Sequence, residues 1–128
     1  MRLLPREQDL LLVFVAAELA RRRRASGLKM NHPEAVALIC DAMLEAARAG
    51  LSYAEVEAAG RSALREDELL DGVRALLDEV RLEVLLRDGT RLIVLIDPLG
   101  ATNPLVQLTP ESASAVLRRP TSVQGATK

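Results

Sequence analysis

Apolar residues repeat at helical spacing through the first half of the chain and at alternate positions shortly after residue 80. This change of period, with capping residues before the helical segments, predicts a helical bundle followed by two strands. The predicted elements are a helix over Pro5–Ala25, a helix from its cap Asn31 to a stop at Gly50, a helix from its cap Ser52, short helical turns at residues 65–70 and 73–79, and a hairpin ending at Ile96. We therefore expect an α+β fold with three main helices and one antiparallel β-hairpin.

The second predicted helix has the clearest local signals. Asn31 can accept a hydrogen bond from the first turn, and Glu34 can reach back to the Asn31 N–H, which is a capping box. Pro33 falls in the first turn, where its missing N–H has no cost, and Gly50 is placed to end the helix in a left-handed conformation. The apolar face comprises Val36, Ile39, Cys40, Met43 and Ala47.

The other two helices begin in opposite ways. Ser52 and Glu55 form a second capping box before the third helix, whose inward face we expect Gly60 to break. Leu4 precedes the first helix and cannot cap it, which costs about 1 kcal/mol. We expect Leu3 and Leu4 to compensate by packing as a hydrophobic staple.

Every residue from Leu10 to Ala17 in the first helix is apolar, so this helix carries an apolar ring and not a stripe. One interpretation is a central helix, buried on all sides within one domain. The other, which we prefer, is a helix covered partly by its own chain and partly by another. In that case an outward residue such as Val13 would contact a partner, and Val13→Glu would disrupt assembly more than folding.

Four consecutive arginines, Arg21–Arg24, close the first helix before Gly27. Cations near a helix C-terminus are favourable next to the helix dipole, and their side chains are usually solvated. A nucleic-acid patch is the alternative. The run is one turn long, lacks neighbouring aromatics and belongs to a nearly neutral chain, so no nucleic-acid partner is expected.

The last predicted element is the hairpin. Residues 81–87 alternate in polarity, which indicates a strand with one better-buried face. Asp88 and Gly89 are expected to form its two-residue turn, because both tolerate the positive φ that such a turn needs. The run Leu92–Ile96 is apolar on both faces, and a lone hairpin is marginal in water. It must pack on the helices and offer its other side to something else.

Composition narrows the functional classes. Hydrophobic residues make up 49% of the 128 residues and aromatics only 2%, so the core must be aliphatic. The net charge of −1 excludes a general polyanion binder, and the single cysteine fits a reducing compartment. The apolar run is too short to span a bilayer, and residues 1–30 lack the order of a signal peptide. We expect a cytoplasmic protein with no membrane partner.

Residues that could carry chemistry are few. A hydrolytic metal site needs several His, Cys, Asp or Glu ligands, and the chain has one histidine, His32, and one cysteine, Cys40. His32 lies in a capping loop, and Cys40 lies on the apolar face of its helix, where a buried thiol is the usual case. No Gly-rich phosphate loop, nucleophile elbow or zinc-type spacing occurs. No catalytic, cofactor-binding or metal-ligating residue is therefore expected in this chain.

One stretch closely resembles a family signature. The segment Leu28-Lys29-Met30-Asn31-His32-Pro33-Glu34-Ala35-Val36-Ala37-Leu38-Ile39 is similar to that of the gamma (small) subunit of bacterial urease. Further matches follow in the family's order at Pro5-Arg6-Glu7, Ala17 to Arg24, Gly60-Arg61, Asp71-Gly72-Val73 and Asp88-Gly89-Thr90. The resemblance covers about the first hundred residues.

The resemblance implies a non-catalytic structural subunit. Ureases hydrolyse urea to ammonia and carbamate at a two-nickel centre whose ligands belong to the alpha subunit. A gamma subunit packs on alpha and beta subunits within a trimer of heterotrimers. The chain departs from the family pattern at the hairpin turn, Leu86-Arg87-Asp88-Gly89, and at Asp97, where the family usually has histidine. The alternative is a diverged gamma-like scaffold or regulatory binding module outside an active urease.

The chain is expected to divide into a urease-gamma-like domain, residues 1–99, and a C-terminal extension, residues 100–128. The extension is richer in Thr, Ser, Pro and small residues. Thr109 and Pro110 form a helix-start signal, and Arg118-Arg119-Pro120 a stop. They predict a short helix over Pro110–Arg119 followed by a disordered end.

Overall fold

The computed structural model describes residues 1–100. In chain order these residues form α1 (Pro5–Ala25), α2 (His32–Arg48), α3 (Tyr53–Arg61), a 3₁₀ turn (Glu66–Glu68), α4 (Val73–Leu76), β1 (Glu79–Leu86) and β2 (Gly89–Ile96). The predicted α+β class, with three main helices followed by an antiparallel hairpin, is confirmed. The helix predicted over Pro110–Arg119 and the predicted disordered end lie outside the described residues, and the division into two segments stays a prediction.

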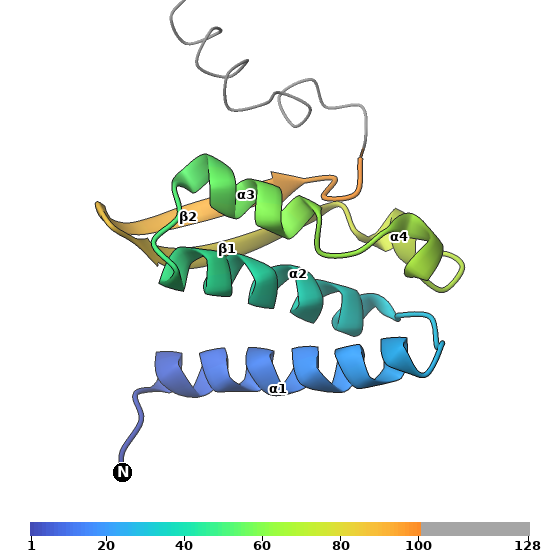
Figure 1. The fold of residues 1–128 in the computed structure, drawn as a ribbon, viewed down its shortest axis with the longest axis horizontal. Coiled ribbons are helices and arrows are strands. Elements are labelled where there is room, and N and C mark those ends of the chain that lie inside the picture. The colour runs from blue at the N-terminus through green and yellow to red at the C-terminus, as the bar shows by residue number, and fades with distance from the viewer. Residues whose placement is uncertain (101–128) are drawn as a thin grey trace, which may run out of the picture.

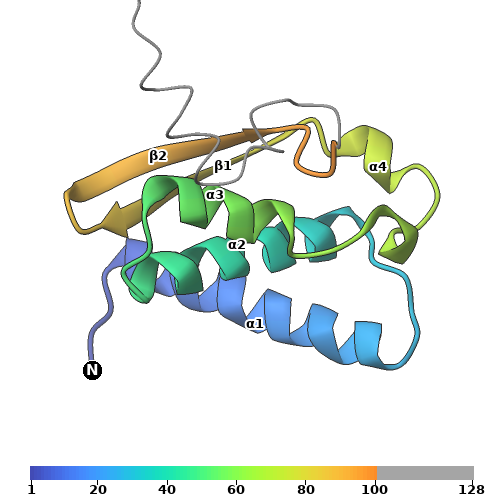
Figure 2. The ribbon, with the colours of Figure 1, turned by 45° about the horizontal axis from the view of Figure 1, so that its top comes forward.

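Helix α2 is the centre of the fold. Figure 1 shows it between α1 on one side and a layer of α3 and the hairpin on the other. Figure 2 shows the hairpin and α3 on the same side of α2, opposite α1. Of its 17 residues, ten are buried, whereas α1 buries two of its 21. Aliphatic side chains fill this core, among them Ile39, Met43, Val56, Val84, Ile93 and Leu95.

Both predicted capping boxes are confirmed. The Asn31 Oδ1 accepts from the Glu34 N–H at 2.9 Å, and the Glu34 carboxylate accepts from the Asn31 N–H at 2.8 Å. Ser52 and Glu55 repeat the arrangement at 3.2 and 2.9 Å. Gly50, just past α2, has φ +85°, the left-handed conformation expected at a helix end. These local signals fix where α2 begins and ends.

The start of α1 differs from the prediction. Leu4 is exposed, so the expected hydrophobic staple is wrong. The Glu7 carboxylate instead accepts from the Leu4 N–H at 2.7 Å, which supplies half of a capping box. A carboxylate in the first turn also interacts favourably with the helix dipole. One acidic side chain therefore replaces the missing cap.

Gly60 does not break α3 but lies inside it, buried near its C-terminal end. A Cβ at this position would lie 2.7 Å from Leu95 Cδ1 and 2.8 Å from Met43 Cγ. The missing side chain therefore lets the α3 backbone approach α2 and β2 closely. The interruption predicted in the inward face is thus a point of close packing, where glycine leaves room for Leu95 and Met43.

The hairpin turn is one residue earlier than predicted. Leu86 pairs with Gly89, so the two turn residues are Arg87 and Asp88. Of Arg87, Asp88 and Gly89, only Gly89 has a positive φ, +120°, and Gly89 is the first residue of β2. The prediction failed because glycine at the position after the turn gives the same sequence signal as glycine within it.

The two faces of the hairpin differ, as predicted. Val80, Val84, Ile93 and Leu95 are buried against the helices. On the opposite face Leu92 and Ile96 are 52% and 54% exposed. The second strand is therefore apolar on both faces but covered on one.

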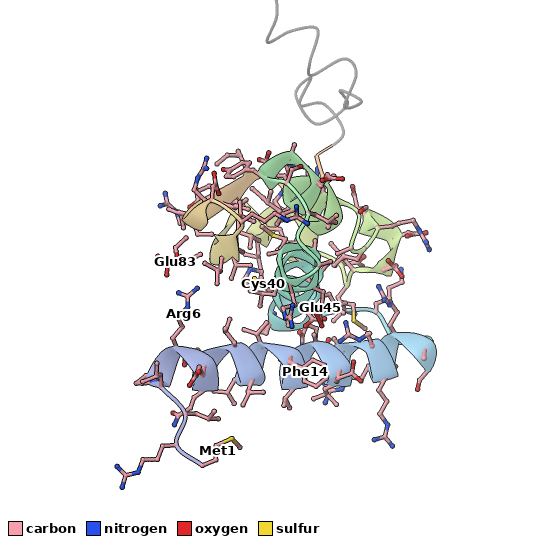
Figure 3. The ribbon with its side chains drawn as sticks, turned by 60° about the vertical axis from the view of Figure 1, so that its left-hand side comes forward. Met1, Arg6, Phe14, Cys40, Glu45 and Glu83 are labelled. Atoms are coloured by element: carbon pink, nitrogen blue, oxygen red, sulfur yellow. The ribbon has the colours of Figure 1, made fainter. Side chains whose placement is uncertain are left out.

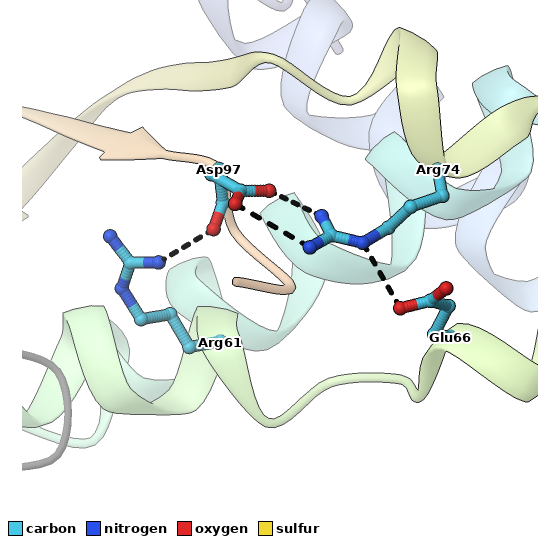
Figure 4. A network of polar contacts seen from close by, with 4 residues as sticks. All are labelled: Arg61, Glu66, Arg74 and Asp97. Carbon is cyan, nitrogen blue, oxygen red and sulfur yellow. Dashed lines mark hydrogen bonds and ion pairs between the residues drawn. The ribbon is translucent and has the colours of Figure 1, made fainter. Parts of the chain in front are cut away.

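An ionic network fastens the end of the hairpin (Figure 4). Arg74 donates to the carboxylate of Asp97 and, at 3.1 Å, to Glu66. Arg61 donates to the Asp97 backbone oxygen at 3.1 Å, and the Gly100 N–H donates to the same oxygen at 2.7 Å. Asp97 has φ +44°, a left-handed conformation that Asp tolerates better than most residues. The chain is thus turned and held where β2 ends.

Candidate subunit interface

The two sides of α1 have opposite environments. Ala17 and Ala20 are fully buried against α2, and Val13 is half-buried and packs on the same core. On the opposite side four apolar residues are exposed, and we call them the outer stripe: Leu11, Leu12, Val15 and Leu19. Figure 3 shows side chains of α1 extending away from the rest of the molecule. The interpretation of α1 as a central helix buried on all sides is therefore wrong.

The choice of Val13 as an outward residue is also wrong. Val13 lies on the α2 side, one turn from Ala17, so a charge there would disturb the packing of the chain itself. A ring that is apolar on every side contains no information about which side faces inward. The outward positions follow from the structure, with Leu12 65% exposed.

The outer stripe is a continuous surface. Apart from the neighbours Leu11 and Leu12, its members are three, four, seven or eight residues apart, and such spacing places side chains on one helix face. Contiguous exposed apolar surface on a folded domain marks an interaction site.

Within residues 1–100, no helix has the length and apolarity to cross a bilayer.

The hairpin carries a second uncovered apolar surface. We call it the outer row: the exposed Leu92 and Ile96 and the half-buried Val94 on β2, with the exposed Leu85 on β1. The residues that pair with the three β2 members are Glu83, Arg81 and Glu79, so the β1 side of this face is largely charged. The exposed apolar area is therefore concentrated along β2.

The basic run ties α1 to the rest of the fold. Arg21 pairs with Asp41 at 2.9 Å, and Arg23 pairs with Glu34 at 2.6 Å. Arg24 donates to the backbone oxygen of Ala63 at 3.2 Å. These contacts, which the sequence analysis missed, reach 11 to 39 residues along the chain. The signal that could have revealed them is the pair of carboxylates on the buried helix α2, since buried carboxylates need cationic partners.

Glu34 shows how this attachment affects ionisation. The Asn31 backbone N–H lowers the pKa of Glu34 below its ordinary value, and the Arg23 guanidinium lowers it further. Burial acts in the opposite direction and is outweighed. The carboxylate that caps α2 therefore stays charged and also anchors α1.

A groove lies beside the first half of α1. Its volume is about 690 Å³. It is bounded by α1, the second half of α2 and the turn end of the hairpin; its lining includes Leu10, Phe14, Leu44, Leu85 and Leu86, with Asp41, Glu45, Arg48 and Arg87. Arg6 donates to Glu83 between α1 and β1, as Figure 3 shows. The groove has an apolar lining and charged groups of both signs.

The residues considered for chemistry are not brought together. His32 is the first residue of α2, while Cys40 is buried two turns further along. Burial, with a smaller contribution from the charge of Asp41, raises the pKa of the Cys40 thiol to about 11. Within residues 1–100 no three His, Cys, Asp or Glu side chains are grouped so that they could hold a metal ion. This donor set does not fit a nickel centre.

The fold and its surface define a class. A small α+β domain with two uncovered apolar surfaces, on α1 and on β2, has the form of a subunit of a larger assembly. The family model described as "Urease, gamma subunit" matches residues 1–99. The chain belongs to the urease gamma subunit family, which confirms the resemblance found in its sequence. Membership gives it the role of a urease subunit.

Proposed function

We propose that this chain is a non-catalytic structural subunit that mediates assembly of a urease complex. Its partners are alpha and beta urease subunits, in a trimer of heterotrimers in the cytoplasm. The complex hydrolyses urea to ammonia and carbamate, and the alpha subunit holds the nickel. Family membership supports this proposal. The observation that carries the assembly role is the outer stripe of α1, which the rest of residues 1–100 leaves exposed.

Burial of the outer stripe explains why an assembled state would be favoured. Covering apolar surface contributes about 25 cal/mol per Å² removed from water. Four aliphatic side chains on one face therefore supply several kcal/mol before the cost of association. The outer row on β2 adds a second contact on a different element. Two such surfaces allow contact with more than one neighbour.

The test is co-expression with the alpha and beta subunits, followed by purification through a tag on alpha. Leu12→Glu with Val15→Glu places two charges in the outer stripe. We expect at least a tenfold loss of this chain from the complex, because burying an unpaired charge costs several kcal/mol. Leu76→Glu is the matched control, since Leu76 on α4 is similarly exposed, at 62%, and lies outside both surfaces.

Two results would contradict the proposal. One is a wild-type chain that never co-purifies with alpha and beta, which would favour the gamma-like scaffold outside urease. The other is a stripe variant that assembles as well as the wild type. Metal analysis of the isolated chain after dialysis is expected to find no stoichiometric nickel, because the chain offers no cluster of ligands within residues 1–100. Bound nickel would overturn the non-catalytic assignment.

A further inference from the structure

The groove between α1, α2 and the hairpin has an apolar lining formed from three elements. Leu10 and Phe14 come from α1, Leu44 from α2, and Leu85 and Leu86 from β1. Arg6, Leu10 and Phe14 are spaced four residues apart, so they lie along one face of α1. Arg6 spans from this face to Glu83 and connects the two walls. The volume of the groove, about 690 Å³, is in the range that holds several side chains.

Some of the charged side chains that line the groove have an ion-pair partner within residues 1–100, and others do not. Asp41 already pairs with Arg21 at 2.9 Å. Within residues 1–100, neither Arg48 nor Arg87 has a carboxylate within ion-pair distance. Glu45 also lines the groove and has no cationic partner in this part of the chain. Two unpaired arginines against one unpaired carboxylate leave an excess of positive charge beside the apolar lining.

Gly50 gives Arg87 its place at the groove. A Cβ on Gly50 would lie 2.9 Å from Arg87 Nη2 and 3.0 Å from Nε. The guanidinium therefore lies directly over this glycine, where a side chain at position 50 would displace it. A guanidinium is planar and offers several N–H donors in a fixed geometry, which suits a carboxylate.

We propose that this groove binds an acidic, leucine-rich segment of a partner subunit, whose aliphatic side chains enter the apolar lining and whose carboxylate pairs with Arg48 and Arg87. Only the source of this segment, a urease subunit, rests on the proposed function. The groove is distinct from the outer stripe because none of the four stripe residues lines it. The groove selects a partner segment that is both apolar and acidic, whereas the outer stripe selects only for apolar surface.

The direct test uses the full chain labelled at leucine methyl groups and observed by NMR. The probe is an acetylated peptide of alternating leucine and glutamate, and its control replaces each glutamate with glutamine. We expect the methyl signals of Leu10, Leu44, Leu85 and Leu86 to shift with the acidic peptide. Arg48→Gln or Arg87→Gln should each weaken binding about two- to fivefold, as for a solvent-exposed ion pair. Equal binding of the glutamine peptide, or shifts confined to the outer stripe, would overturn the proposal.

Co-expression separates this inference from the proposed function. Arg48→Glu with Arg87→Glu is expected to reduce recovery with tagged alpha and beta subunits, while Arg65→Glu, at an exposed arginine that does not line the groove, should not. If the wild-type chain assembles and the double variant assembles equally well, the groove proposal is wrong and the assembly role stands. If the wild-type chain does not assemble but the peptide binds as expected, the urease role fails and the chemistry of the groove stands.

Discussion

Helices α1 and α2 are neighbours in sequence and in space, yet they are held in different ways. Helix α2 buries ten residues between two layers, and its apolar face fits the core. Helix α1 has an apolar run of eight residues but buries only Ala17 and Ala20 completely. Its other attachments are the ion pairs and hydrogen bonds of Arg6, Arg21, Arg23 and Arg24. Apolar content alone therefore does not place a helix in the core.

The difference shows two uses of apolar residues in one small domain. In α2 they stabilise the fold, because they are removed from water within the chain. In the outer stripe of α1 they remain largely exposed within residues 1–100, so they stabilise this part of the fold less and contribute most when a partner covers them. Charged side chains then position α1 so that this surface points outward. Substitutions on the two helices should separate these two uses.

The largest effect on folding is expected in α2. Ile39→Ala removes a side chain with no exposed area and should lower the free energy of unfolding by about 2–5 kcal/mol, because it leaves a cavity. Leu12→Ala on α1 should change it by less than about 0.5 kcal/mol, because the side chain is already in water. Urea denaturation of both variants measures the contrast. Equal losses would show that α1 is part of the core after all.

A smaller effect should follow from enlarging the contact between the helices. Ala17→Leu places a large side chain where α1 and α2 approach closely, and overpacking of this kind costs about 1–3 kcal/mol. Ala16→Leu is the matched control, since Ala16 is exposed on the same helix. Thermal melting of the pair is the measurement. A neutral Ala17→Leu variant would mean that the contact is looser than the burial of Ala17 indicates.

The charged attachment predicts a specific dependence on pH. The folded-state pKa of Glu34 lies below its ordinary value of 4.5, so its contribution is complete above about pH 4.5 and is lost as pH falls through the lower, folded-state value. Glu34→Gln should cost about 1–2 kcal/mol at pH 7 and less at pH 3. Stability curves for both proteins from pH 3 to 7 test this. Parallel curves would show that the carboxylate charge contributes nothing.

The smallest effect is expected from removing residues 101–128. The buried core described above is built from α2, α3 and the hairpin, and Arg61 and Arg74, both within residues 1–100, hold Asp97 at the end of β2. The free energy of unfolding should therefore change by less than about 0.5 kcal/mol. Loss of a cooperative melting transition in the shortened chain would contradict this expectation.

The sequence predicted most reliably what depends on nearby residues. The capping boxes at Asn31 and Ser52 were predictable because both partners lie three residues apart. The side of α1 that faces outward was not, because a ring of apolar residues has no preferred direction. The role of Arg21 was also missed, since its partner Asp41 is 20 residues away. At the candidate interface, the existence of uncovered surface followed from the sequence, while its residues required the fold.

The turn at Asp97 has a practical consequence for labelling. Eight residues of β2 separate the two ends of the hairpin, which at about 3.3 Å per residue is roughly 25 Å. The groove lies at the turn end, near Arg87, while Asp97 and Gly100 lie at the other. A fluorescent protein or affinity tag joined directly after Gly100 would thus start its path far from the groove. Such a fusion offers a handle for single-molecule work that leaves the groove open.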